Sequence, residues 1–239
     1  MKPEPPKQES DPPRIVGIVA ATLAGASVQA TATLRVNLSV QHLLAAVRFA
    51  CEVATIEQMH FGEPFGPFFD ELFWFSSGCV FSSVAGIEAY VNEIFVDRAQ
   101  HFKDLRPEVI DKLWELFERK KTLDKFDMAL LLKQRAKLTR GTRPAQDVVA
   151  LISLRDSLVH FKPEWANEQG THARVAELLR NRFALSPFLS ESESIFPRRW
   201  ASRGCARWAV DSAVDFLLAF ESSSGIPPKV SKFIHRLRS

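Results

Sequence analysis

Apolar residues recur at helical spacing along most of the chain, and they predict an antiparallel helical bundle. Apolar positions three or four residues apart mark the buried face of a helix. Prolines and glycines separate these stretches by mostly short connections, as between neighbouring helices of a bundle. The fold class is therefore predicted as all-α. The predicted helices cover residues 40–59, 68–102, 108–119, 126–138, 144–161, 171–183 and 204–222.

The stretch from residue 68 to 102 differs from the other predicted helices because it is apolar or small on almost every face. Such a helix lies at the centre of a bundle rather than on its surface. Small residues within it, among them Gly78 and Gly86, would let neighbouring helices approach closely. Glu88 and Asn92 lie four residues apart and would share one face. Because an unpaired buried carboxylate is costly, Glu88 needs a partner.

The first 37 residues do not show the helical pattern. Residues 1–14 hold five prolines among charged residues and predict a disordered leader. In residues 15–37, apolar and polar positions alternate from Val28 to Val36, which predicts a short β-hairpin. The alternative is a membrane-associated segment over residues 15–34, although its threonines and serines dilute the apolar character that a membrane span needs.

Composition places the chain among soluble globular proteins, with 46% hydrophobic and 25% charged residues. Its cysteines, Cys51, Cys79 and Cys205, are odd in number and far apart, so we expect buried free thiols in a reducing cytoplasm rather than disulfides or a zinc site. The net charge of +3 alone does not indicate a nucleic-acid-binding protein. Glycine-rich phosphate loops, nucleophile elbows and metalloprotease motifs are absent from the sequence, so no cofactor or metal is expected.

Titratable residues concentrate near the end of one predicted helix, in residues 151–163. Asp156 and His160 are four residues apart, so the carboxylate could reach the imidazole and raise its pKa. Arg155 and His160 are five apart, which separates them by roughly 140° around a helix. They can meet only if the helix loosens ahead of Pro163, or if a second copy of the chain brings them together.

The pattern Arg155-Asp156-x-x-x-His160 resembles the signature of HEPN domains. That signature is an arginine, a polar residue directly after it, and a histidine four to six intervening residues further on. Residues 83–95 are similar to the long first core helix of this group, and residues 205–210 to its last helix. The resemblance covers residues 38–222 and leaves residues 223–239 as a basic C-terminal tail.

This resemblance implies an all-α bundle that commonly forms a homodimer around a shared cleft. Many members are metal-independent endoribonucleases of bacterial defence or toxin–antitoxin systems, in which a ribose 2′-hydroxyl attacks the adjacent phosphorus. It further implies that His160 is the general acid or base, that Arg155 offsets transition-state charge and that Asp156 orients either group. The implied partners are RNA, a second copy and a partner protein such as an antitoxin. Some members have lost catalysis and only bind RNA or assemble with other proteins.

The same residues also allow a structural alternative. Arg155 would neutralise Glu88 inside the bundle, and His160 would end its helix, where the dipole favours a cation. Glu88 and Asn92 would then support the packing of the bundle. Under this hypothesis the chain is a non-catalytic helical protein-interaction module. Basic residues cluster in three further stretches that could contact phosphates, although no DNA-specific motif is present: residues 135–143, 198–207 and 229–238.

Overall fold

The computed structural model describes residues 20–23, 26–29, 36–165 and 170–239. The chain divides into two compact units, residues 1–36 and 37–239. In the first unit, strands β1 (Ala20–Leu23) and β2 (Ala26–Gln29) pair in antiparallel fashion. The predicted leader 1–14 and most of the predicted 15–37 segment lie outside the described residues.

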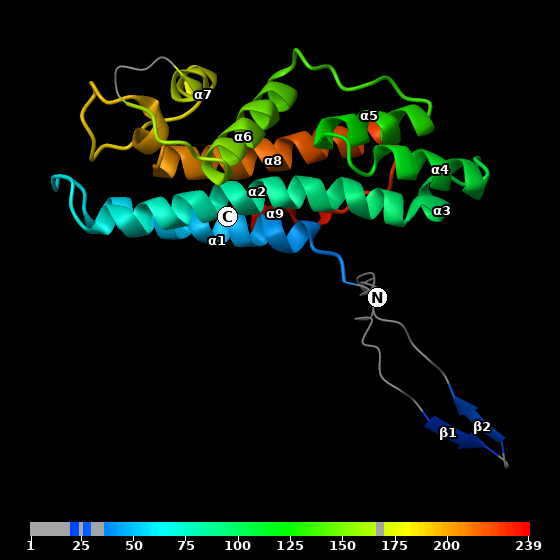
Figure 1. The fold of residues 1–239 in the computed structure, drawn as a ribbon. Helices are drawn as coiled ribbons and strands as arrows, with labels where there is room; N and C mark the ends of the chain where they lie inside the picture. The colour runs from blue at the N-terminus through cyan, green and yellow to red at the C-terminus, as the bar shows by residue number, and fades with distance from the viewer. Residues whose placement is uncertain (1–19, 24–25, 30–35, 166–169) are drawn as a thin grey trace, which may run out of the picture. The chain divides into compact units, whose positions relative to one another are not determined.

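The second unit is a helical bundle, so the all-α prediction is confirmed for its described residues (Figure 1). Most of the predicted helices are present, with bounds shifted by a few residues. Between α7 (Thr171–Leu179) and α8 (Arg203–Ser224), Phe196 interrupts the short helical turn η1 (Ile195–Arg199) with a non-helical backbone. The helices are α1 (Ser39–Met59), α2 (Phe68–Val96), α3 (Arg98–His101), α4 (Pro107–Phe117), α5 (Thr122–Leu132), α6 (Arg143–Val159), α7 (Thr171–Leu179), α8 (Arg203–Ser224), the 3₁₀ turn η2 (Val230–Phe233) and α9 (Ile234–Leu237).

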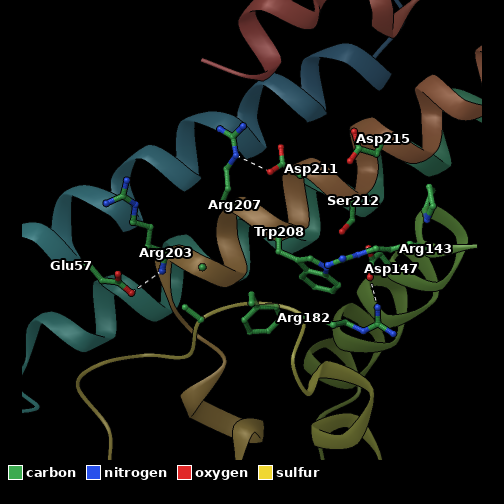
Figure 2. Close-up of a pocket in the computed structure, with 14 residues that line it drawn as sticks. Glu57, Arg143, Asp147, Arg182, Arg203, Arg207, Trp208, Asp211, Ser212 and Asp215 are labelled. Atoms are coloured by element: carbon green, nitrogen blue, oxygen red, sulfur yellow. Dashed lines mark hydrogen bonds and ion pairs between the residues drawn. The ribbon is translucent and has the colours of Figure 1, made fainter.

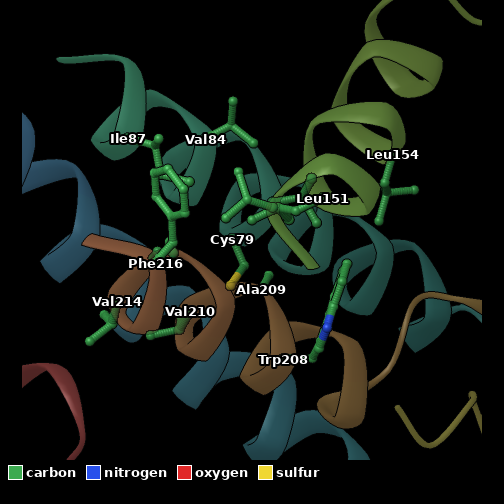
Figure 3. Close-up of a cluster of buried hydrophobic side chains, with 14 of the residues drawn as sticks. Cys79, Val84, Ile87, Leu151, Leu154, Trp208, Ala209, Val210, Val214 and Phe216 are labelled. Carbon is green, nitrogen blue, oxygen red and sulfur yellow. The ribbon is translucent and has the colours of Figure 1, made fainter. Parts of the chain in front are cut away.

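Helix α2 is the central element of this bundle. Helices α1 and α8 pack along it, and α5 and α6 contact it as well (Figure 1). Side chains from α2, α6 and α8, including Ile87, Leu151 and Phe216, meet in one hydrophobic core (Figure 3). By length and composition α2 could also cross a membrane, but 61% of its most apolar stretch is buried inside the bundle. This burial is typical of the core helix of a globular protein.

Several helix ends follow from local sequence signals. Pro107 and Pro144 stand in the first turns of α4 and α6, where a missing backbone N–H costs nothing. At the start of α8, the Ser202 hydroxyl accepts the N–H of Cys205 at 3.0 Å, which is a side-chain cap. The same helix ends at Gly225, whose φ of 69° is the left-handed conformation that glycine adopts readily.

The predicted continuous helix over residues 68–102 is wrong at Asp97, where the backbone leaves the helical region. Directly after this break, the Arg98 side chain donates to the carbonyl of Phe95 at 3.1 Å and pairs with Asp111 of α4 at 2.5 Å. These contacts hold the chain where it turns from α2 into α3 and on to α4. The break therefore depends on a partner thirteen residues away, which the spacing of apolar residues did not indicate.

Two further predictions near the basic stretches are corrected. Helix α5 begins four residues earlier than expected and ends at Leu132, before Gln134 with a φ of 54°. Asp127 then accepts the N–H of Leu138 at 2.8 Å, so the chain folds back as a loop instead of continuing as a helix. Residues 223–239 are not a separate tail, because Val230 and Leu237 are fully buried in the bundle.

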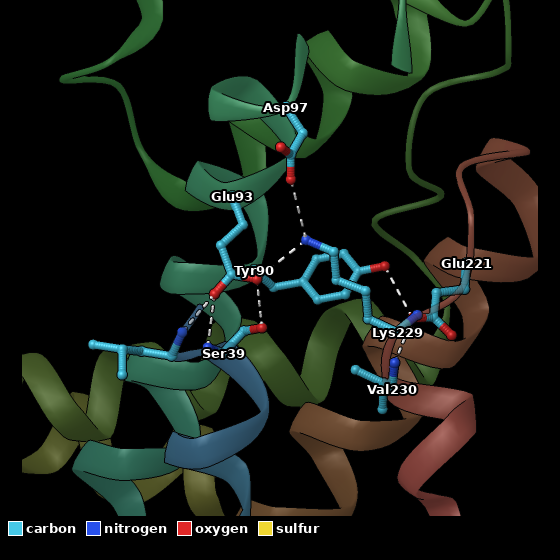
Figure 4. Close-up of polar contacts among 8 residues, drawn as sticks. Ser39, Tyr90, Glu93, Asp97, Glu221, Lys229 and Val230 are labelled. Carbon is cyan, nitrogen blue, oxygen red and sulfur yellow. Dashed lines mark hydrogen bonds and ion pairs between the residues drawn. The ribbon is translucent and has the colours of Figure 1, made fainter. Parts of the chain in front are cut away.

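Two buried carboxylates join the ends of four elements (Figure 4). Glu93 of α2 accepts both the backbone N–H and the hydroxyl of Ser39 at 2.8 Å, which caps the start of α1. Glu221 of α8 accepts the Tyr90 hydroxyl at 3.0 Å and the N–H of Lys229 at 2.6 Å. The Lys229 ammonium lies 3.2 Å from Glu93 and links the two. Burial, followed by the charge of Glu221, raises the pKa of Tyr90.

Candidate functional site

Helix α6 ends between the two main residues of the predicted motif. Arg155 lies within the helix, whereas His160 directly follows it with φ −106° and ψ 36°. The His160 N–H still bonds to the carbonyl of Asp156 at 2.9 Å. The expected loosening ahead of Pro163 therefore does occur, and it begins at His160.

Arg155 points from α6 towards α2 and forms an ion pair there. Its Nη2 donates to Glu88 Oε1 at 2.5 Å, and Glu88 also accepts the Thr122 hydroxyl at 3.3 Å. The Arg155 Nε lies 2.9 Å from Asp156 Oδ1, in an ion pair that lacks hydrogen-bond geometry. The prediction that Glu88 needs a partner is confirmed, and that partner is Arg155.

Asn92 lies one turn further along α2 and connects it to α5. Its side-chain oxygen accepts from the Lys125 ammonium at 3.0 Å. The same ammonium stands 5.4 Å from the centre of the Trp114 ring, a cation–π arrangement. Burial lowers the pKa of Lys125, and the nearby charges of Glu88 and Glu118 offset part of that effect. Glu88 and Asn92 thus both hold neighbouring helices against α2.

Arg155, Asp156, Glu88 and Asn92 all line one cavity of about 880 Å³, which we call the basic cavity. Seven cationic side chains line it against three carboxylates, so its charge is strongly positive. Such an excess within a cleft concentrates anions. The cations are Arg119, Lys120, Lys121, Lys125, Arg140, Arg155 and Arg174, and the carboxylates are Glu88, Asp124 and Asp156.

His160 does not line the basic cavity. It is exposed, and within the described part of the chain its ring makes no hydrogen bond or ion pair. The expected pair between Asp156 and His160 is wrong for these residues, since Asp156 pairs with Arg155 instead. Spacing along a regular helix predicted that pair, but His160 lies just beyond the helix, where this periodicity no longer applies.

Exposed aromatic residues lie close to the end of α6. Trp74 and Phe81 of α2, with Leu158 and Phe161, line a mostly apolar cavity of about 630 Å³. We call these four residues the apolar surface. Large exposed apolar patches mark interaction sites in soluble proteins. Phe161 follows His160 directly in the chain, so this surface adjoins the predicted catalytic residue.

A second polar cavity, of about 790 Å³, lies between α6, α8 and the segment that follows α7 (Figure 2). Four arginines and four carboxylates line it, and we call it the mixed-charge cavity. Asp147 of α6 pairs there with Arg182 and, at 3.3 Å, with Arg143. Sequence reasoning missed this cavity, because its residues come from separate parts of the chain. The arginine–aspartate spacings 143–147 and 207–211 were the available signal.

No cluster of three or more His, Cys, Asp or Glu side chains among the described residues could hold a metal ion. Cys79 and Cys205 are buried, and burial raises the pKa of the Cys79 thiol to about 12. The prediction that all three thiols are buried is wrong for Cys51, which is exposed. Cys51 lies away from the side of α1 that buries Leu43 and Val53 against the bundle.

Comparisons of this chain with protein-family models, with curated proteins and with solved structures find no match.

Proposed function

We propose that this chain is a HEPN-like RNA-binding protein whose basic cavity holds phosphates around Arg155. The observation that carries the proposal is the excess of seven cationic side chains over three carboxylates in that cavity. Cations that neutralise backbone phosphates supply most of the affinity for nucleic acids. The choice of RNA rests on the resemblance at Arg155-Asp156-x-x-x-His160. A role in a cytoplasmic bacterial defence or toxin–antitoxin system rests on the same resemblance.

Cleavage of the bound RNA would require a homodimer. A general acid or base must lie within hydrogen-bond reach of the proton that it transfers. In a single copy, Arg155 lines the basic cavity and His160 does not. In the proposed endoribonuclease, a second copy therefore supplies His160, while Arg155 offsets charge at the phosphorus and needs no metal.

Charge reversal within the basic cavity tests the binding proposal. Lys121→Glu and Arg174→Glu alter exposed cations that line the cavity, so each should weaken binding of a fluorescent single-stranded RNA about tenfold. The slope of log affinity against log salt should also fall by roughly 0.7 for each lost phosphate contact. The matched control is Lys232→Glu, which alters an exposed lysine of η2 that does not line the cavity. Equal losses in all three variants would contradict a site in this cavity.

Cleavage is tested separately, with single-stranded RNA in the presence of EDTA. The wild type should cleave, and the Arg155→Ala, His160→Ala double variant should not. A His235→Ala variant controls for the loss of an exposed histidine elsewhere. If the wild type and the double variant cleave equally, catalysis at this site is excluded, while the binding proposal is judged by the charge reversals alone.

The second candidate function is a non-catalytic protein-interaction module. The apolar surface favours it, and so does the ion pair that ties Arg155 to Glu88. In that case His160→Ala leaves the effect of the protein on the cells that express it unchanged. Arg155→Ala lowers the melting temperature of the protein and does not change its affinity for RNA.

A further inference from the structure

Asp156 presents an accessible hydrogen-bond acceptor to the basic cavity. Its side chain lines that cavity and is 54% exposed. Its Oδ1 lies in the ion pair with Arg155 Nε at 2.9 Å, whereas Oδ2 has no partner among the described residues. A carboxylate offers about four acceptor positions on its two oxygens. A ligand in the cavity can therefore donate a hydrogen bond to Asp156.

Arg155 places a hydrogen-bond donor directly beside this acceptor. Its Nη2 donates to Glu88, while Nη1 has no hydrogen-bond or ion-pair partner in the described part of the chain. Solvent reaches Nη1, unlike the enclosed Nε of the same side chain. Arg155 and Asp156 thus form a donor–acceptor pair in the wall of the basic cavity, held together by their own ion pair.

The ribose–phosphate unit of RNA has the complementary pair of groups. Its 2′-hydroxyl is a donor, and it stands on the carbon next to the one that carries the 3′-phosphate. The 2′-hydroxyl is also the group by which a protein distinguishes RNA from DNA. We propose that Asp156 accepts the 2′-hydroxyl of a ribose whose 3′-phosphate is bound by Arg155, and that the basic cavity thereby selects RNA over DNA. This inference rests on the proposed function, because it needs the cavity to bind the phosphates.

The charges around Arg155 favour a hydroxyl beside one phosphate over two phosphates. Glu88 and Asp156 both contact the one guanidinium, so this part of the cavity has no surplus of positive charge. A second phosphate at Asp156 would meet a like charge, whereas a hydroxyl would donate to it. The neighbouring phosphates of the strand have other partners, namely four lining cations that form no ion pair among the described residues: Arg119, Lys120, Lys121 and Arg174.

DNA should bind this site more weakly because it lacks the donor. The 2′-carbon of deoxyribose carries only hydrogen, so bound DNA would cover Asp156 without replacing the hydrogen bonds that water makes to it. A site that hydrogen-bonds a ligand hydroxyl rejects the analogue without that hydroxyl. Among the described residues no aromatic side chain lines the basic cavity, so bases do not stack there and the selection is made at the sugar.

Three fluorescent oligouridines of equal length test the proposal in anisotropy titrations with the full chain. They carry a hydroxyl, a fluorine or a hydrogen at the 2′ position. Fluorine keeps the sugar close to its RNA conformation but cannot donate, so it separates the hydrogen bond from the shape of the sugar. Every protein in the series carries His160→Ala, outside the basic cavity, so that the RNA stays intact. We expect the hydroxyl form to bind about tenfold more tightly than either of the others.

Two aspartate variants locate the contact. Asp156→Ala and Asp124→Ala each remove one carboxylate from the basic cavity, so both change its charge by the same amount. In Asp156→Ala the three oligouridines should bind within about twofold of one another, because the acceptor for the hydroxyl is gone. In Asp124→Ala the preference should persist, since Asp124 lies on α5, where its ion-pair partner is Arg140 at 3.5 Å.

The contrary results are separable from a failure of RNA binding itself. Equal binding of all three oligouridines to the His160→Ala protein would leave the proposed function intact and overturn selection by the 2′-hydroxyl. Binding of the fluorine form as tightly as the hydroxyl form would mean that the shape of the sugar is read instead, which also overturns it. So would a preference that survives in Asp156→Ala. If no oligouridine binds, the proposed function and this inference are both overturned.

Discussion

At the residue scale, Arg155 serves both the packing of the bundle and the proposed site. Two carboxylates, Glu88 and Asp156, lie within 2.9 Å of its guanidinium. A guanidinium carries five N–H donors, so these contacts leave donors that can face the basic cavity. A structural ion pair and a phosphate contact are therefore compatible in one side chain.

The ion pair between Arg155 and Glu88 should stabilise the fold measurably. Its side chains are 26% and 35% exposed, so solvent screens it only in part. A double-mutant cycle with Arg155→Ala and Glu88→Ala, followed by urea unfolding, should give a coupling free energy of roughly 0.5–1 kcal/mol. The control cycle removes the more exposed Arg48–Glu52 pair of α1 and should give a smaller value. Equal coupling in both cycles would show that the Arg155 pair does not hold α6 to α2.

His101 should make stability depend on pH. Burial, followed by the charge of Lys229, lowers its pKa, with Lys133 acting in the same direction and Asp97 opposing them. Both ring nitrogens are buried without a hydrogen-bond partner among the described residues. The unfolded chain therefore binds a proton at this residue more readily than the folded protein. The folded protein therefore keeps its full stability, as far as His101 is concerned, above about pH 6.5. As the pH falls below this value, protonation of His101 in the unfolded chain lowers the free energy of unfolding.

The measurement compares wild type with His101→Phe, which keeps an aromatic ring next to Phe102 but cannot titrate. Urea unfolding at about pH 5.5 and about pH 7.5 gives the decline in stability for each protein. The decline should be smaller in the variant. An identical decline in both proteins would mean that His101 does not contribute to it.

At the scale of helices, the close approach of α1 and α2 depends on Gly86. A Cβ at this position would lie 2.8 Å from Leu43 Cδ2 and 3.2 Å from the carbonyl oxygen of Ser39. Leu43 is fully buried in the hydrophobic core, so its side chain can move away only against its core neighbours. The expectation that small residues of this helix allow close packing is confirmed at Gly86.

Alanine substitutions at two glycines of α2 should have different effects on stability. Both substitutions gain about 1 kcal/mol of helix propensity. At Gly86 the clash with Leu43 should outweigh this gain and lower stability by roughly 1–3 kcal/mol. At Gly78 the nearest neighbour is the half-buried Phe49 ring at 3.2 Å, which can move, so stability should stay the same or rise. Calorimetric melting temperatures of the two variants check this difference, and equal shifts would contradict it.

At the scale of the whole molecule, the described bundle leaves the apolar surface next to the end of α6 uncovered. We expect this surface to mediate the proposed homodimer, because burying it removes apolar area from water. The basic cavity and His160 lie in different places on one copy. Association is therefore the step that would complete a catalytic site.

A charged substitution in the apolar surface should prevent dimerisation. Light scattering should give a dimer mass for the wild type and a monomer mass for Trp74→Lys, since a lysine there would be buried without a partner in the dimer. Leu116→Lys provides the control, because Leu116 is a similarly exposed apolar residue on α4, outside this surface. A wild type that stays monomeric at all concentrations would rule out the dimer.

Prediction from sequence succeeded where the signal was local. The predicted helix over residues 40–59 corresponds to Ser39–Met59, and the one over residues 204–222 to Arg203–Ser224, because their apolar stripes are long and regular. It failed where a distant partner decides the structure. Glu93 is buried because it caps α1, which begins 54 residues earlier in the chain. Glu221 is buried because Tyr90, 131 residues away, donates to it.

The sequence by itself determined the helical bundle of the described residues after Val36 and placed Glu88, Arg155 and Asp156 on their helices, because helical burial follows from the spacing of apolar residues over a few turns. Only the tertiary structure decided which of these side chains meet. It brought Arg155 to Glu88, 67 residues away, and left His160 outside the basic cavity. It also assembled the mixed-charge cavity from separate segments. The reason is that such contacts depend on how helices pack and where each one ends, which local spacing does not specify.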